Sequence, residues 1–390
     1  MKIRLFDKHN LDKLIWPETE EGEFAKKYLT PLIERGTEKF IENAKTDLRI
    51  LAFDDQVIPI TINETDYDNS YLISSYFVAA SAKEKAETLS PLPRMVARLL
   101  AALYGKLLKK VKINKVVILN NWLLTTNPYT QLTQTQMEGI THFLRMLFPD
   151  HYFMFRSINT YKENQVFEAL SHANYRMIPC RHVYLYDPTL TPKLSSSTIR
   201  KQKKDYNRIK SRNYEVKSLS SPTDEQIERL LTLYAMVYYD KYTKYSPSYT
   251  PEYLRHLQMS QLLEVKVLMK GDQIYGVNGF LQKSGYLLVS FFGYDTTVPQ
   301  EEGLYRMLSG IILEEIEKRK LLSHQGSGAP QFKKWRGYLE EIEYVAIYDK
   351  HLPLHRRLFW KMGHFFSSRK YPTTSPSPTN SGSAEPITAG

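Results

Sequence analysis

The sequence is poor in cysteine: it has one, Cys180, in 390 residues, and this excludes an intrachain disulfide. The surrounding segment, RMIPCRHVYLY, is typical of a buried strand, so we expect a core residue rather than a nucleophile. The ten histidines are scattered along the chain. His351 and His355 are four residues apart, but Pro353 between them argues against a helical metal pair. We therefore expect no metal site.

Long apolar runs are also lacking. No stretch of the sequence reaches the length of a membrane span. The first residues, MKIRLFDKHNLDKLIW, do not contain the apolar core of a secretory signal. We therefore expect a cytoplasmic protein, and any membrane contact should be peripheral, at the inner membrane face.

Acidic residues are outnumbered by basic ones, and the formal net charge is +11 with a sequence pI of about 9.3. This charge favours anionic partners, namely phosphorylated cofactors, nucleic acid or an acidic membrane surface, without choosing among them. The sequence shows no zinc finger, basic zipper or RNP signature of a dedicated nucleic-acid protein. A hydrophobic content of 42% is enough to bury a core, and the length suggests two or more domains.

Strand and helix patterns alternate along the first half after an opening hairpin, which predicts a mixed sheet with helices on its faces. The pattern breaks near Pro188. A very basic helix over 197–212 follows, and Ser195 suits its cap. The second half then runs helix, hairpin, strand, helix and two strands. We expect an N-terminal domain over 1–190 and a C-terminal domain over 195–350, with similar architecture but no sequence repeat.

Three local predictions belong to this scheme. The segment SYLISSYFVAA, residues 70–80, fits a strand. Ser221 and Asp224 resemble a capping box at the start of a helix. Gly271 and Asp272 mark the turn of a hairpin.

Two segments combine apolar and basic residues. Residues 92–111 have clear helical periodicity, and we favour a core helix with a solvated basic face over a membrane-surface helix. The segment 351–370 mixes aromatic and cationic residues beyond the last strand, so it is the better candidate for a membrane-surface anchor. The tail 371–390 is rich in Pro, Ser, Thr and Gly and should be disordered.

One candidate for phosphate binding is the segment Gln300-Glu301-Glu302-Gly303-Leu304-Tyr305, at a strand-to-helix turn. A phosphate cradle needs free N–H groups at a helix N-terminus and a glycine that lets the backbone approach the anion. Gln300 and Gly303 are placed for that role. Tyr305 stands where a small residue is expected, and Glu301 and Glu302 would repel a phosphate. The alternative is an ordinary capped helix start.

A second candidate is the loop SHQGSGAPQFKKWRG, residues 323–337. Its glycine and small residues precede a cation–aromatic–cation segment that contains Phe332, Lys333, Arg336 and Gly337. Such segments suit a phosphate or an acyl-carrier arm. The alternative is a loop with an aromatic anchor and solvated lysines.

Together these elements resemble the acyl-CoA N-acyltransferase (GNAT) fold. More specifically, the order of strand, Gln300-x-x-Gly303 helix, strand, GSGAPQFKKWRG loop and strand is similar to the branch with two tandem GNAT-like domains. That branch includes acetyltransferases with an F-K-x-x-x-G element and the Fem-type peptidoglycan aminoacyltransferases. The resemblance covers most of residues 45–350, and the basic helix takes the place of a positively charged helix after the first domain.

The resemblance implies two tandem GNAT-like domains with mixed central sheets flanked by helices. It also implies acyl transfer onto an amine, from acetyl-CoA or another acyl-CoA, or from aminoacyl-tRNA in the Fem branch. The C-terminal domain would hold the donor and the N-terminal domain the acceptor. The residues that would bind the donor are Gln300, Gly303, Lys333, Arg336 and Gly337.

Candidates for the proton-transfer groups of such a reaction are Asp295, Tyr294 and His324, which follow strand ends in the second half. Asp295 equally suits a turn or a helix cap, and a loop histidine is more often structural than a base.

Polar residues at strand ends of the first half could line an acceptor cleft between the domains. We consider Asn121, Arg156 and Asn159 for this role, with Tyr242 from the second half. The alternative is that the strand-end residues cap the helices that follow.

The first hypothesis is thus an N-acyltransferase that moves an acyl group, acetyl in the first instance, from acyl-CoA to a small-molecule or peptide amine. The second is a Fem-like aminoacyltransferase that uses charged tRNA. The third is a catalytically inactive GNAT-like protein that binds at an anionic membrane surface.

Overall fold

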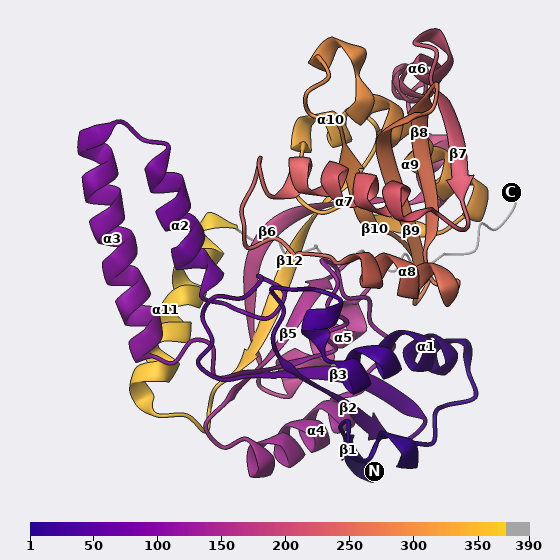
Figure 1. The fold of residues 1–390 in the computed structure, drawn as a ribbon. Coiled ribbons are helices and arrows are strands. Elements are labelled where there is room, and N and C mark those ends of the chain that lie inside the picture. Colours follow the sequence, from indigo (N-terminus) through magenta and orange to yellow (C-terminus); the bar gives the residue numbers. More distant parts are fainter. Residues whose placement is uncertain (372–390) are drawn as a thin grey trace, which may run out of the picture.

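One mixed β-sheet of twelve strands runs through residues 1–371, the part of the chain that the computed structural model describes (Figure 1). The strand order is β1-β2-β3-β4-β5-β12-β6-β11-β10-β9-β8-β7. The predicted disordered tail lies outside the described residues, apart from Tyr371. The strands are β1 (Ile3–Phe6), β2 (Asp47–Phe53), β3 (Gln56–Asn63), β4 (Val116–Leu119), β5 (Tyr152–Asn159), β6 (Arg176–Tyr186), β7 (Glu215–Leu219), β8 (Glu264–Lys270), β9 (Gln273–Lys283), β10 (Tyr286–Tyr294), β11 (Leu322–His324) and β12 (Leu339–Tyr348).

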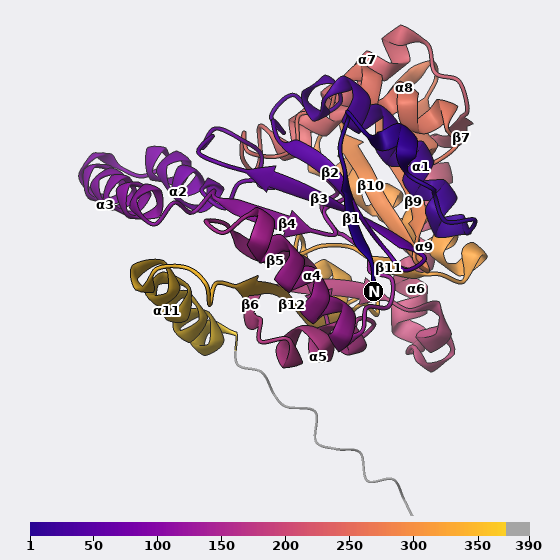
Figure 2. The ribbon, with the colours of Figure 1, turned by 90° about the horizontal axis from the view of Figure 1, so that it is seen from below.

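Helices cover both faces of this sheet (Figure 2). α1, α7 and α8 share one apolar cluster on one face, which spans both halves of the molecule. On the opposite face α4 and α5 pack on the first half, and α6 and α9 pack on the second. The predicted α/β fold with a mixed sheet flanked by helices is therefore confirmed. The helices are α1 (Glu20–Arg35), α2 (Phe77–Glu87), α3 (Pro91–Lys110), α4 (Gln134–Leu147), α5 (Asn164–His172), α6 (Ser196–Ser211), α7 (Asp224–Tyr238), α8 (Pro251–Met259), α9 (Leu304–Arg319), α10 (Pro330–Lys334) and α11 (Leu354–Lys370).

The two halves repeat one architecture. In the first half β2, β3 and β4 form an antiparallel meander, and β4 then pairs parallel to β5. In the second half β8, β9 and β10 form the same meander, and β10 pairs parallel to β11. The repeat of architecture without a sequence repeat, which the element order predicted, is present in the structure.

The two halves also exchange a strand. β6, from the end of the first half, pairs with β11 of the second half, and β12, from the end of the second half, pairs with β5 of the first. β6 and β12 pair with each other between them. The hydrogen-bonded sheet is therefore continuous across the predicted domain boundary at 190–195.

Of the local predictions, the hairpin turn is confirmed, and the capping box lies two residues from its predicted place. Gly271 has φ +59° at the β8–β9 turn, as the hairpin prediction requires. The capping box of α7 is built by Thr223 and Gln226, not by Ser221 and Asp224. Gln226 reaches back to the N–H of Thr223 at 3.0 Å, a contact for which the shorter Asp side chain is unsuited.

The strand predicted over 70–80 is wrong, because this segment contains a turn and the start of α2. Buried Asn114 stabilises the turn. Its side chain accepts a hydrogen bond from the N–H of Tyr76 at 3.2 Å, and its amide group contacts the Ser74 hydroxyl at 2.9 Å. These bonds replace the ladder bonds that a strand would have needed.

The interpretation of 92–111 as a core helix is also wrong. α2 and α3 form a hairpin that follows β3 and projects away from the rest of the molecule (Figure 1). Only Ala101, Gly105 and Leu108 of α3 are buried, while most of its large apolar side chains are exposed. Within residues 1–371, no helix is both long and apolar enough to cross a membrane.

Candidate functional site

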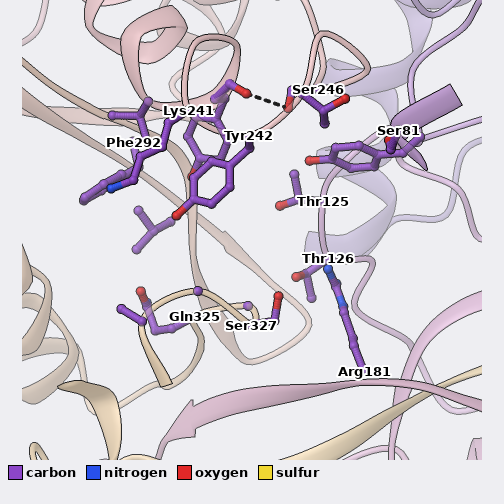
Figure 3. Close-up of a pocket in the computed structure, with 18 of the residues that line it drawn as sticks. Ser81, Thr125, Thr126, Arg181, Lys241, Tyr242, Ser246, Phe292, Gln325 and Ser327 are labelled. Atoms are coloured by element: carbon purple, nitrogen blue, oxygen red, sulfur yellow. Dashed lines mark hydrogen bonds between the residues drawn. The ribbon is translucent and has the colours of Figure 1, made fainter. Parts of the chain in front are cut away.

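A cavity of about 1610 Å³ lies where the two halves meet (Figure 3). Its walls come from β5, β6 and β12 at the centre of the sheet, from β10, α7 and α9 of the second half, and from the loop 325–329. Eight of the twelve residues that the sequence analysis selected line this one cavity. They are Arg156, Tyr242, Tyr294, Asp295, Gln300, Gly303, His324 and Lys333.

The parallel pair β10–β11 opens toward the cavity. The two strands are paired only from Tyr286 to Leu288, although β10 continues to Tyr294. Beyond Leu288 the register of β10 shifts at Ser290, whose hydroxyl has no hydrogen-bond partner among the described residues. Val289 and Ser290 line the cavity. This part of β10 therefore offers an unpaired strand edge on which an extended ligand can form backbone hydrogen bonds.

The strand edge leads to the N-terminus of α9. Gly303 is the N-cap, with φ +79° in the left-handed region, and no side chain of the described chain caps this helix. The first intrahelical bonds are donated by Arg306 and Met307 to the carbonyl of Gly303, so the N–H groups of Leu304 and Tyr305 precede them. Free N–H groups at the positive end of a sixteen-residue helix are suited to an anion.

The acidic residues before α9 repel an anion at this helix N-terminus less than the sequence suggested. Glu302 forms ion pairs with Lys270 at 3.2 Å and with Arg212 at 3.4 Å. The guanidinium of Arg208, from α6, donates to the carbonyl of Glu301 at 3.1 Å. The charge of Glu302 is thus largely balanced, and α6 brings cations to this turn.

Tyr305 contributes to an aromatic wall of the cavity. Its ring packs edge-on against Phe332 at a centroid distance of 5.0 Å, and Tyr294 and Phe292 lie at 6.2 and 6.0 Å. Burial raises the pKa of Tyr305 to about 12, so the phenol is neutral. The residue that departs from the phosphate-binding pattern therefore joins the two predicted donor elements through an aromatic contact.

A charged cluster lies at the centre of the sheet, where β5, β6 and β12 meet. Arg181 donates two hydrogen bonds to the carboxylate of Glu343, at 2.8 and 3.1 Å. Arg156 lies beside this pair and donates to the carbonyl of Leu72 at 2.6 Å. Burial by itself would raise the pKa of Glu343, but Arg181 and His324 hold it at about 2. Arg181 pairs with Glu343, while Arg156 forms no ion pair among the described residues and leaves the cluster with positive charge.

Three irregularities of the sheet bring this cluster to the cavity. The β12–β5 and β12–β6 registers shift around Val345 and Cys180, and the β10–β9 register shifts at Ser290. All three residues line the cavity. β-Bulges redirect side chains next to functional sites. Cys180 is only partly buried, so it is not the core residue that the sequence predicted. Desolvation raises the pKa of its thiol to about 12, which disfavours a nucleophile.

The Nδ1 atom of His324 is held by protein groups. It accepts a hydrogen bond from the N–H of Gly326 at 3.2 Å and contacts the Thr126 hydroxyl at 3.0 Å. Nε2 is buried and lies 3.3 Å from a carboxylate oxygen of Glu343, without a hydrogen-bond partner among the described residues. His324 therefore helps to shape the loop, and its role in proton transfer stays a prediction.

Lys333 is buried at the cavity wall. Its Nζ donates to the carbonyls of Gln325 and Gly326, the latter at 3.4 Å. Burial, together with the nearby charge of Arg181, lowers the pKa of Lys333 to about 7. A neutral amine can donate to both carbonyls and keep its lone pair, so Lys333 combines a loop-shaping role with the capacity to accept a proton.

Asp295 lies at the cavity but is committed to local contacts. It forms an ion pair with Arg229 at 2.7 Å and accepts hydrogen bonds from the N–H and hydroxyl of Thr297. Burial would raise the pKa of Asp295, but the bonds from Thr297 and Arg229 keep it below its usual value. A carboxylate of this kind is a weak base, and the turn-residue alternative fits it better.

Two residues of the predicted donor set lie outside the cavity. Arg336 is buried, forms an ion pair with Asp205 of α6 at 2.8 Å, and stacks on Phe332 at 3.8 Å. Gly337 has φ +82°, and a Cβ there would lie 2.6 Å from a side-chain carbon of Leu194. Both residues hold α6 and the loop in place without facing the cavity.

Two residues of the predicted acceptor set also lie outside it. Asn121 is fully buried and donates to the Thr61 hydroxyl at 2.9 Å and to the carbonyl of Leu72 at 3.1 Å. Asn159 contacts the hydroxyl of Tyr286 at 3.3 Å. For these two residues the structural alternative is the better account.

Arg181 and Glu343 were not predicted from the sequence. Both lie in strands that looked like core strands, and they are 162 residues apart in the chain. The sequence offers only a weak signal for them, because β6 also contains Arg176 and His182, and β12 also contains Glu340 and Glu341. Within residues 1–371, no three His, Cys, Asp or Glu side chains are grouped closely enough to hold a metal ion.

A scan against protein-family models and a search of curated protein sequences both find no match for this chain. Solved structures similar to it include L-PGS from Bacillus licheniformis, with 14% identity and a TM-score of 0.46 over 64% of this chain and 83% of that one. FemX matches with 8% identity and a TM-score of 0.46, over 93% of this chain and 100% of that one. A tandem GNAT protein from the clavulanic acid biosynthesis pathway matches with 8% identity and a TM-score of 0.38, over 90% and 99%.

Tandem GNAT and Fem-type proteins, the two kinds of protein that the sequence motifs resemble, are thus both among these structures. The similarity is one of fold, and it does not identify the reaction of this chain.

The first prediction concerns Glu343. Its folded-state pKa of about 2 lies below the unfolded value, so it stabilises the fold above about pH 4.5 and loses that contribution as the pH falls toward 2. Glu343→Gln should cost about 1–3 kcal/mol at pH 7, because it leaves the partly exposed guanidinium of Arg181 without its countercharge. The variant should also lose less stability than wild type as the pH falls from about 4.5 toward 2, as measured by urea unfolding at a series of pH values. Glu341→Gln, on the same strand and without an ion pair in the described chain, is the control. A Glu343→Gln variant as stable as that control would contradict the account.

The second prediction concerns Lys333, whose contribution to stability also rises with pH, but in a higher pH range than that of Glu343. Its folded-state pKa of about 7 lies below the unfolded value, so the unfolded state binds more protons between about pH 7 and 10. Wild-type stability should gain up to about 1.4 kcal/mol per pH unit from this residue in that window. Lys333→Met should remove this component, while Lys334→Met, at the exposed neighbour, should retain it. Parallel stability curves for wild type and Lys333→Met would show that Lys333 titrates normally.

Proposed function

We propose that the chain is an N-acyltransferase that moves an acyl group from acyl-CoA to an amine in the cavity between its two halves. The observation that carries this proposal is the open edge of β10, which leads directly to the uncapped N-terminus of α9 along one wall of the cavity. An acyl-CoA has amides in its pantetheine arm that match a strand edge, and a pyrophosphate that matches a helix N-terminus.

The reaction needs few protein groups. The acceptor nitrogen attacks the thioester carbonyl carbon, a C–N bond forms, the C–S bond breaks, and the thiolate leaves. The amine loses one proton, and we assign its acceptance to Lys333, which lines the cavity and has a pKa of about 7. The assignment fails if Lys333 proves to titrate near its normal pKa. Holding the two substrates together supplies most of the remaining acceleration.

The acceptor would enter opposite the donor, on the side of the cavity formed by β5 and β6. Arg156 and Arg181 lie there. Tyr242, beyond the end of α7, lines the same cavity with a largely exposed ring, and its hydroxyl points toward the loop 325–329 (Figure 3). A small-molecule or peptide amine fits a cavity of this size.

A second candidate donor is aminoacyl-tRNA, and one observation favours it. α6 carries a basic groove of about 470 Å³, and one of its residues, Arg208, contacts the turn before α9. A phosphate backbone could follow α6 to the cavity, and a terminal base could stack on the aromatic wall. The groove is lined by Arg200, Lys203, Lys204, Asn207, Arg208, Ser211 and Arg212.

The third prediction tests the donor by calorimetric titration of the full chain with acetyl-CoA and with CoA, at low and moderate salt. We expect one-to-one binding that persists at moderate salt. Gln300→Glu adds a negative charge beside the α9 terminus and should weaken binding about fivefold, or roughly 1 kcal/mol. The control is Gln273→Glu, an isosteric change at an exposed residue at the start of β9 that keeps its acceptor role toward Tyr275.

The outcomes of this titration separate the hypotheses. The proposed donor site would be contradicted if acetyl-CoA binding is unaffected by Gln300→Glu, or if it disappears at moderate salt. A second outcome is that uncharged tRNA binds instead of acetyl-CoA. If the salt dependence of tRNA binding is then reduced in the Lys203→Gln and Lys204→Gln variants, and is unchanged in the Lys8→Gln and Lys13→Gln controls, aminoacyl-tRNA is the donor. If neither ligand binds, the chain is not an acyltransferase of this type.

A further inference from the structure

The α2–α3 hairpin and α11 expose an unusual concentration of large apolar side chains on one side of the molecule. Figures 1 and 2 both place the two elements on the same side. On α3 the exposed fractions run from 47% to 72%, and on α11 from 46% to 66%. We call these side chains the α3–α11 surface. It consists of Leu92, Met95, Val96, Leu99, Leu100, Leu103, Leu107, Leu354, Leu358, Met362, Phe365 and Phe366.

The arrangement on α3 is that of a helix turned outward. Leu92, Leu99 and Leu103 recur at helical spacing on one face, so their side chains form a continuous stripe. The face toward α2 is built from small residues, Ala101 and Gly105, and from Leu108. Single exposed apolar residues are normal on a protein surface, but a stripe of this length marks an interaction site.

Cations surround the stripe. The hairpin, residues 77–111, has seven Lys and Arg against two Glu, and α11 has five Lys and Arg and no acidic residue. Lys106 and Lys110 share the helical face of Leu103 and Leu107, nearer the base of the hairpin. The partner of this surface must therefore have both an apolar region that accepts large side chains and a negative charge.

The two elements are fixed to each other. Buried Arg356, from α11, donates to the carbonyl of Val111 at the end of α3 at 2.9 Å and to the carbonyl of Asp150 at 2.6 Å. Phe359 and Trp360 of α11 pack in the small apolar cluster at the base of the hairpin. The surface is thus presented as one unit and not as two independent helices.

We infer that the α3–α11 surface docks on an anionic lipid bilayer. The apolar side chains would enter the boundary between headgroups and acyl chains, and the lysines and arginines would contact lipid phosphates. A second copy of the chain is disfavoured, because it would place two positively charged surfaces against each other. The inference concerns binding alone and does not depend on the proposed reaction.

Docking would also orient the cavity. Phe77 and Val78 of α2, Tyr104 of α3, and Phe359 and Trp360 of α11 line its outer end. The cavity is therefore lined in part by the same helices that carry the α3–α11 surface, and a docked molecule would hold this end of the cavity near the bilayer.

The test is co-sedimentation of the full chain with phosphatidylcholine vesicles that contain or lack phosphatidylserine. We expect binding to the anionic vesicles that weakens with salt, and much weaker binding to the neutral ones. Leu99→Ser with Leu103→Ser should reduce binding at least about tenfold. Lys106→Gln with Lys110→Gln should reduce it on the order of fivefold for each lysine.

Matched controls are Ile15→Ser with Met259→Ser, which change apolar residues 87% and 85% exposed elsewhere on the molecule. Lys8→Gln with Lys13→Gln is the control for charge. Thermal unfolding should be unchanged in all four variants, since the altered side chains are exposed. Vesicle binding that survives both α3 variants would contradict the inference. A vesicle-free dimer that Leu99→Ser with Leu103→Ser dissociates would also contradict it, because a second copy would then cover the surface.

Discussion

The exchange of β6 and β12 between the two halves determines how the sheet, the cavity and the buried charges are arranged. β6 belongs to the first half but pairs with β11 of the second, and β12 belongs to the second half but pairs with β5 of the first. Neither half therefore has a complete sheet by itself. The exchange fixes the halves at the centre of one sheet and leaves the two parallel pairs, β4–β5 and β10–β11, on either side of it. The cavity forms beside this junction, and its walls therefore come from segments that are far apart in the sequence.

The same junction explains the charge inside the cavity. A regular central strand would bury apolar side chains on both faces, but the register shifts around Cys180 and Val345 turn polar residues toward the cavity. A buried carboxylate needs partners, and Glu343 has Arg181 and His324. These charges are tolerated because the centre of the sheet borders a cavity and not a packed layer. The wall formed by β10 and the N-terminus of α9 offers unpaired backbone groups instead.

Much of the fold and part of the site could be predicted from the sequence. The element order gave the mixed sheet and the repeated architecture, because hydrophobic periodicity is a local property. The motif residues Gly303 and Lys333 do line one cavity. Arg181 and Glu343 were missed because their pairing depends on the strand exchange, which no local pattern encodes. The apolar stripe of residues 92–111 was interpreted as core, since periodicity shows that a face is apolar but not what covers it.

The most direct test of the central claim, that the donor lies along the open edge of β10 beside the strand junction, is amide hydrogen exchange with and without acetyl-CoA. Backbone groups that gain a hydrogen-bond partner exchange more slowly. The account predicts new protection in peptides that cover residues 289–294 and the first turn of α9, with no change in the β2–β3 hairpin. Protection confined to other segments, with residues 289–294 unaffected at saturating acetyl-CoA, would contradict it.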